Sequence, residues 1–98
     1  MLIVSQDKEE IVNFNVSFSV YITEKYDYDK NETIGYNIFV KHFEEVEFLG
    51  TYKTKERARE VLEEIIEFYE DTKQKMMLQN VHMLYAEKFD FVYYMPQQ

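Results

Sequence analysis

The sequence predicts an α+β fold, with a mainly antiparallel sheet of about five strands and one or two helices packed on it. Two observations carry this prediction. Residues 12–23 alternate between apolar and polar side chains, which is the period of a strand with one buried face. Residues 55–70 instead repeat apolar side chains three and four positions apart, as an amphipathic helix does. Because 98 residues suffice for only one core, we expect a single domain over residues 1–98.

The first half of the chain is expected to supply most of the strands. Residues 2–5 predict a short strand, and the alternating stretch 12–23 predicts a longer one that is bent or divided around Asn13 to Asn15. Residues 24–32 are polar and predict a hairpin loop. Gly50 lies inside a later apolar run, where a glycine usually marks a bulge or a close approach of another segment. The remaining strands are expected at residues 34–40, 46–53 and 89–95.

The first helix is expected from Lys55 to about Glu70, with the Thr54 hydroxyl as its N-cap. Its apolar stripe would face the sheet and consists of Ala58, Val61, Leu62, Ile65 and Tyr69. The apolar phase changes after Asp71, so we expect the helix to break there and a second helix to span residues 73–86. That second helix either packs on the first or pairs with another copy of the chain, which would make a homodimer.

Charge and composition argue against several functional classes. A net charge of −8 disfavours direct binding of nucleic acid or of an anionic membrane. The absence of cysteine excludes disulfides, thiolate catalysis and cysteine-ligated metals, and it suits a reducing compartment. No apolar run approaches the roughly 20 residues that span a bilayer, and the N-terminal stretch does not resemble a signal peptide. We therefore expect a cytoplasmic protein in the cytosol of a bacterial host.

Motifs for catalysis and for metal binding are not found in the sequence. His42 and His82 stand apart without a spaced partner, and neither Gly35 nor Gly50 opens a phosphate-binding loop. The serines lack the sequence context of a nucleophile. We expect a protein that is not an enzyme and holds no cofactor and no metal. An acid cluster of the glycosidase or nuclease kind stays open as an alternative.

Acidic side chains gather at three places that could bind a partner. The predicted helix carries an exposed stripe of Glu60, Glu63, Glu64, Glu67 and Asp71. The expected hairpin loop combines acids with tyrosines, which are favoured at interfaces: Glu24, Tyr26, Asp27, Tyr28 and Asp29. The third group, Glu44, Glu45 and Glu47, is more simply interpreted as exposed charge. Like charges along one helix face repel each other, so the stripe in particular calls for a function. Plain solubility is the alternative for all three groups.

Basic side chains cluster once, at the start of the predicted helix: Lys53, Lys55, Arg57 and Arg59. The helix macrodipole favours acids at this end, so helix stability does not explain the order of the charges. Arg57 and Arg59 could instead line a pocket for a phosphate-bearing ligand, in this interpretation across a dimer.

Three stretches resemble small proteins carried by phages and mobile elements of Firmicutes. They are IVSQDKEEIVNF at residues 3–14, LGTYKTKERAREVLEEI at residues 49–65 and YYMP at residues 93–96. The stretch from 71 to 88 looks longer than in such proteins. The resemblance implies a context that includes inhibitors of bacterial defence, among them anti-CRISPR proteins and sponges that sequester nucleotide second messengers.

The charge pattern favours one of these two activities. Cas effectors hold nucleic acid in positively charged channels, and an acidic chain can occupy such a channel as a DNA mimic. The expected function is therefore an anti-CRISPR-like inhibitor that binds a basic, nucleic-acid-binding surface such as that of a Cas effector. The alternative is a sponge for a nucleotide second messenger, in which Arg57 and Arg59 would bind the ligand.

Overall fold

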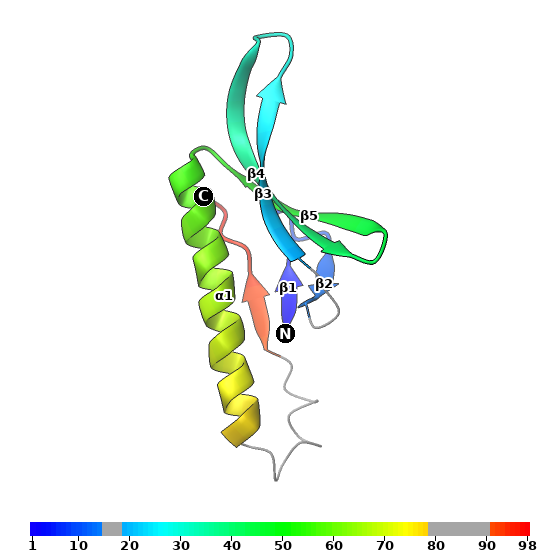
Figure 1. Ribbon diagram of the computed structural model, residues 1–98, viewed down its shortest axis with the longest axis vertical. Coiled ribbons are helices and arrows are strands. Elements are labelled where there is room, and N and C mark those ends of the chain that lie inside the picture. The colour runs from blue at the N-terminus through cyan, green and yellow to red at the C-terminus, as the bar shows by residue number, and fades with distance from the viewer. Residues whose placement is uncertain (15–18, 79–90) are drawn as a thin grey trace.

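The computed structural model describes residues 1–14, 19–78 and 91–98 (Figure 1). Within these ranges the chain forms six strands and one helix, which confirms the expected α+β class. The elements in chain order are β1 (Leu2–Val4), β2 (Ile11–Asn13), β3 (Ser19–Asp27), β4 (Glu32–His42), β5 (Glu45–Tyr52), α1 (Lys55–Leu78) and β6 (Val92–Tyr94).

The strands form two three-stranded sheets, where the sequence led us to expect one. In the first sheet β1 lies between β2, to which it is antiparallel, and β6, to which it is parallel. The second sheet is an antiparallel meander in the order β3–β4–β5. The alternation of apolar and polar residues indicates where a strand lies but not with which strand it pairs, so the sequence could not reveal this division.

The alternating stretch is divided between the two sheets, as the expected turn around Asn13 to Asn15 suggested. β2 ends at Asn13 and β3 begins at Ser19, and residues 15–18 lie outside the described ranges. The hairpin loop expected at residues 24–32 is mostly strand, because β3 continues to Asp27 and β4 begins at Glu32. Cross-strand pairing extends to Asp27↔Glu32, so backbone hydrogen bonding overrides the polar composition of this stretch. The resulting hairpin projects beyond the rest of the molecule (Figure 1).

The helix α1 is continuous from Lys55 to Leu78, so the break expected after Asp71 is wrong. Thr72 explains the continuity, because it takes a place on the buried face of the helix with 4% of its surface exposed. Its hydroxyl donates to the Tyr69 carbonyl oxygen at 2.9 Å, which satisfies the buried polar group. Residues 73–78 of the expected second helix are the last turns of α1, and residues 79–86 lie outside the described part of the chain, so a homodimer through this segment stays a prediction.

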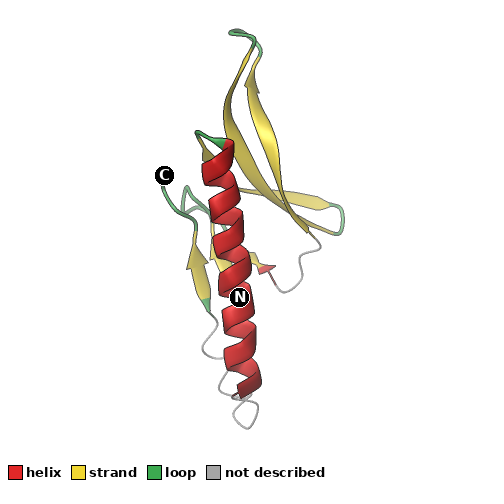
Figure 2. Cartoon of the chain, turned by 60° about the vertical axis from the view of Figure 1, so that its left-hand side comes forward, coloured by secondary structure: helices red, strands yellow, loops and turns green. Residues whose placement is uncertain are grey.

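The core lies between α1 and the two sheets. Its buried apolar side chains, as far as the structure describes them, are Met1, Ile3, Val12, Ile38, Val40, Leu49, Tyr52, Ala58, Val61, Ile65 and Met95. The stripe predicted for the helix is confirmed: three of its members belong to this set, while Leu62 and Tyr69 are half-buried. Figure 2 shows α1 running past both sheets, with its N-terminus near the base of the projecting hairpin. Among the described residues, no helix is long and apolar enough to cross a membrane.

Candidate functional site

A pocket of about 480 Å³ lies where the start of α1 meets the end of β5, the base of the β3–β4 hairpin and the C-terminal segment. Its described lining includes three cationic side chains, Lys25, Lys53 and Arg57, and no acidic one. The chain as a whole has a net charge of −8, so the lining has the opposite sign to the whole molecule. We call it the basic pocket. Its volume lies within the range of about 300 to 1,000 Å³ that is typical of small-molecule sites.

Gln6 builds one wall of the basic pocket by joining three segments. Its Nε2 donates to the carbonyl oxygens of Thr51, Pro96 and Gln97 at 3.0, 3.2 and 3.2 Å. The Thr51 N–H donates back to Gln6 Oε1 at 2.8 Å, and Gln97 Nε2 donates to the Gln6 carbonyl oxygen at 2.8 Å. The side chain therefore fixes the turn after β1, the edge of β5 and the C-terminal segment in one arrangement.

Gly50 allows Gln6 to approach β5. A Cβ atom at this position would lie 3.1 Å from Gln6 Cβ and 3.2 Å from Tyr52 Oη, closer than ordinary contact. The pairing with β4 also skips a residue here, since Ile38 pairs with Gly50 and Phe39 pairs with Phe48. Both the bulge and the close approach expected at Gly50 are thus confirmed.

Tyr52 also holds the C-terminal segment in this wall of the basic pocket. Its hydroxyl donates to the Pro96 carbonyl oxygen at 2.8 Å, and burial raises the pKa of Tyr52 to about 12. The phenol is therefore a neutral donor at physiological pH. Thr54 then caps the helix as expected, because its Oγ1 accepts from the Arg57 N–H at 3.1 Å.

Arg57 is held at the rim of the basic pocket by several oxygen atoms. Its Nε donates to the main-chain oxygen of Gln98 at 2.9 Å, and its NH1 lies 3.0 Å from Glu60 Oε2 and 3.5 Å from Glu64 Oε1. The hydrogen bond to Glu60 is the main cause of a raised pKa of the guanidinium. Tyr93 donates to Glu64 Oε2 at 3.0 Å, which links this network to β6. Arg57 is therefore positioned in advance of any ligand.

The other basic side chains divide between the pocket and the surface. Lys53 belongs to the lining, whereas Lys55 and Arg59 do not. The sequence also missed Lys25, which β3 brings to the pocket from residues that were expected to be loop. Among the described residues, Lys25 and Lys53 form no ion pair with an acid.

The predicted acidic stripe is present on the exposed face of α1, but it is partly neutralised. Glu60 and Glu64 pair with Arg57, and Asp71 Oδ2 lies 3.0 Å from Lys75 Nζ. Within the described ranges, Glu63 and Glu67 are exposed and form no ion pair. These two side chains are the part of the stripe that is available to a basic partner.

The acid-and-tyrosine group lies in the β3–β4 hairpin, where some members have structural roles. Asp27 Oδ1 accepts from the N–H groups of Asp29 and Lys30 at 2.9 and 3.2 Å and so shapes the turn. The Tyr26 hydroxyl donates to Asn31, and Glu24 accepts from Thr33 at 3.4 Å.

Tyr28 is the most exposed member of this group, with 87% of its surface accessible, and its ring stands edge-on to Tyr26 at a centroid distance of 4.9 Å. The hairpin tip points away from the molecule, while α1 extends toward the opposite end (Figure 1). The structure therefore does not bring the two predicted partner-binding groups together.

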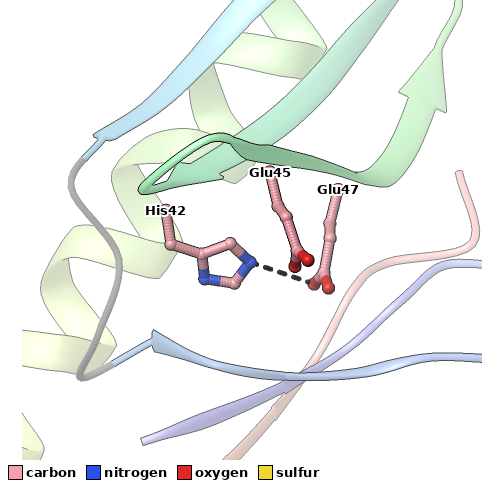
Figure 3. A group of neighbouring side chains, drawn as sticks. All are labelled: His42, Glu45 and Glu47. Carbon is pink, nitrogen blue, oxygen red and sulfur yellow. Dashed lines mark ion pairs between the residues drawn. The ribbon is translucent and has the colours of Figure 1, made fainter.

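One further cluster, in the β4–β5 hairpin, was not predicted from the sequence. The side chains of His42, Glu45 and Glu47 converge below the β4–β5 hairpin, with one potential ligand atom from each lying within 4.8 Å of the others (Figure 3). His42 does not stand apart, as the sequence indicated, because its side chain lies beside two carboxylates and is only 12% exposed. The cluster follows from the pairing register of β4 with β5. His42 pairs with Glu45 across the turn, and the alternation of side chains along β5 places Glu47 on the same face as Glu45.

Comparison with protein-family models, with curated proteins and with solved structures finds no match to this chain. The resemblance to phage-borne proteins therefore stays a prediction. Proposals about function rest on the arrangement of the chain's own residues.

Proposed function

We propose that the chain binds a small phosphate-bearing ligand of the nucleotide class in the basic pocket and sequesters it. The observation that carries this proposal is the lining, in which the described residues contribute three cationic and no acidic side chains around a cavity of about 480 Å³ in an acidic protein. In the phage context that the sequence resemblance implies, the ligand would be a nucleotide second messenger of an antiphage defence system. This was the alternative in the sequence analysis, and the pocket now favours it over a protein-binding inhibitor.

The lining offers different chemistry to different parts of such a ligand. The ammonium groups of Lys25 and Lys53 and the guanidinium of Arg57 would neutralise phosphate oxygens. The N-terminus of α1, which begins beside Thr54, adds the positive end of the helix dipole. Ile34 provides apolar surface for a base or a ribose.

This proposal also accounts for two of the four bases at the start of the helix, Lys53 and Arg57. Bases at a helix N-terminus oppose the macrodipole, at a cost of a few tenths of a kcal/mol each. Ligand binding would explain why Lys53 and Arg57 are present despite this cost, since both line the basic pocket. Once an anion is bound, its charge would offset the unfavourable interaction between these side chains and the dipole.

The test is a binding titration with a matched pair of arginine variants. We expect isothermal titration with ADP-ribose, a cyclic dinucleotide and a linear dinucleotide to give one complex per pocket for at least one of them. Arg57→Gln should weaken that complex at least tenfold, whereas Arg59→Gln should change it less than twofold. Both variants lose one positive charge from the same helix, but only Arg57 lines the pocket.

A second variant separates pocket contacts from side effects. Arg57→Gln also leaves Glu60 and Glu64 without their cation, so its effect has two sources. Lys53→Gln removes a lining cation that forms no ion pair in the described part of the chain. Equal weakening by Lys53→Gln and Arg59→Gln, or no binding of any of the three ligands, would contradict the proposal.

A second candidate function is the acidic, anti-CRISPR-like inhibitor, and Glu63 and Glu67 favour it. Both are exposed on α1 and form no ion pair within the described residues, so they are available to a basic, nucleic-acid-binding surface. We expect the double variant Glu63→Gln/Glu67→Gln to abolish salt-sensitive capture of a guide-loaded Cas effector. The control Glu9→Gln/Glu10→Gln removes the same charge from another exposed site. Equal capture by both double variants would exclude a specific role for the helix.

A further inference from the structure

We propose that His42, Glu45 and Glu47 form a binding site for a divalent zinc-class cation at the end of the β4–β5 hairpin. The site is independent of the basic pocket and of the function proposed for it. Figure 3 shows the imidazole of His42 and the two carboxylates pointing toward a common point from the two strands of the hairpin. The three residues supply one nitrogen and two oxygen ligands, a set that suits Zn²⁺ and its neighbours.

The distances agree with this assignment. Zn²⁺ binds nitrogen and oxygen at about 2.0 to 2.2 Å with tetrahedral geometry, so two of its ligand atoms lie about 3.3 to 3.5 Å apart. His42 Nε2 and Glu47 Oε2 are 3.5 Å apart. The potential ligand atoms of all three residues already lie within 4.8 Å of one another, and the exposed side chain of Glu45 has room to rotate inward.

The state of His42 Nε2 is a second and independent observation. This atom is buried from solvent, yet it makes no hydrogen bond within the described residues. Its 3.5 Å separation from Glu47 is longer than an N–H···O hydrogen bond, which normally spans about 2.7 to 3.2 Å. Buried polar nitrogen atoms without partners are rare in folded proteins, and a bound cation would satisfy this one.

The surroundings leave room to complete the coordination. A depression of about 640 Å³ borders the cluster and is lined by the same three residues together with Phe43 and Glu44. Water can therefore occupy the remaining position, as it does in zinc sites with three protein ligands. Binding would tie the end of β4 to the start of β5, because His42 and Glu45 flank the turn.

The test is a metal titration with four single variants. We expect one Zn²⁺ per chain, measured by competition with a chromophoric chelator, and weakening of at least about tenfold in His42→Gln and in Glu47→Gln. Glu44→Gln should bind as the unchanged protein does. It removes a carboxylate from the same turn and the same depression, but Glu44 is not a member of the converging group. His82→Gln controls for the chain's second histidine.

Two spectroscopic measurements keep the proposal falsifiable should a variant fold poorly. Co²⁺ bound to the unchanged protein should give the intense visible absorption of a four-coordinate ion, and Ca²⁺ in excess should not displace it, because imidazole is a poor Ca²⁺ ligand. The proposal is overturned by equal losses in Glu44→Gln and Glu47→Gln, by loss in His82→Gln alone, or by displacement with Ca²⁺. Each of these outcomes would indicate either attraction to diffuse negative charge or a site elsewhere.

Discussion

Gln6 and Thr51 exchange two hydrogen bonds across the junction of the two sheets. The Thr51 N–H donates to Gln6 Oε1 at 2.8 Å, and Gln6 Nε2 donates to the Thr51 carbonyl oxygen at 3.0 Å. The side-chain amide thus pairs with β5 as a backbone amide would, while the Gln6 N–H donates to the Leu49 carbonyl oxygen at 2.7 Å. Together these bonds cover an edge of the second sheet that would otherwise be open to association with another chain.

We expect Gln6→Ala to lower the free energy of unfolding by about 1 to 3 kcal/mol, because it removes the side-chain partners of the part-buried N–H and carbonyl oxygen of Thr51. Urea denaturation monitored by circular dichroism measures this loss. Gln74→Ala is the matched control, since Gln74 is exposed on α1 and should contribute less than about 0.5 kcal/mol. If the two variants were equally stable, the Gln6 side chain would not be the link between the sheets.

Gly50→Ala is expected to destabilise the protein by about 1 to 3 kcal/mol, although alanine is the smallest possible addition. The added methyl group would lie 3.1 Å from Gln6 Cβ and 3.2 Å from Tyr52 Oη, so both side chains would have to shift. The same denaturation experiment measures the change. Because Gln6 and Tyr52 both line the basic pocket, ligand affinity should fall in parallel. A variant with unchanged stability would show that the bulge can absorb the methyl group.

The features of the fold that depend on residues close together in the sequence could be predicted. Thr54 caps α1, the apolar stripe of the helix is buried, and Gly50 marks a bulge, because each depends on local geometry. The parallel pairing of β1 with β6 could not be predicted, since no local pattern identifies partners so far apart in sequence. The continuity of α1 was missed because Thr72 is polar yet buried, which the apolar pattern alone cannot represent.

In the candidate sites too, residues that are close in sequence could be predicted, and residues that are brought together from distant parts of the chain could not. Arg57 could be named from the charge pattern, because it is one of four bases at alternate positions in a short stretch of the sequence. Lys25 and Gln6 could not be named from the sequence, because they are far from the helix along the chain and only the tertiary fold brings them to the basic pocket. The His42 cluster is a missed local signal: a histidine and two glutamates alternate around a tight hairpin, so their convergence follows from strand register. The expected strands, at residues 34–40 and 46–53, left His42 and Glu45 outside the paired part of the hairpin, whereas β4 ends at His42 and β5 begins at Glu45.

Lys8→Gly is expected to stabilise the protein by about 0.5 to 1 kcal/mol. Lys8 has a φ of 64°, in the left-handed region that disfavours side chains and that glycine adopts freely. The greater freedom of glycine in the unfolded chain offsets part of the gain. The turn itself should persist, because its Lys8 N–H bond to the Ser5 carbonyl oxygen uses the backbone. Chemical denaturation measures the gain.

The control for this change is Lys30→Gly, which removes the same charge from another exposed turn, at a position where φ is not positive. That variant should gain no stability. If both variants were stabilised alike, loss of positive charge rather than relief of backbone strain would be the cause.

Tyr52 should make the protein less stable at alkaline pH. Burial raises its pKa from 10.0 to about 12, whereas in the unfolded chain the phenol ionises near its usual value. Since the folded pKa is the higher one, the stabilising contribution is complete below pH 10 and is lost as the pH rises toward 12. In the folded state the neutral hydroxyl also donates to the Pro96 carbonyl oxygen, a bond that a phenolate cannot make.

We therefore expect unfolding free energies measured between pH 8 and pH 12 to fall less steeply for Tyr52→Phe than for the unchanged protein. Below pH 10 the variant should be the less stable of the two, because it lacks the hydrogen bond to Pro96. Other tyrosines and the lysines titrate in both proteins, so the difference between the two curves reports Tyr52 together with its effect on Tyr93, whose pKa is raised by burial, by Glu64 and by Tyr52. Tyr28→Phe is the control in which the removed hydroxyl belongs to an exposed side chain at the tip of the hairpin. A curve for Tyr52→Phe that is parallel to that of the unchanged protein would mean that the Tyr52 hydroxyl remains accessible to hydroxide in the folded state.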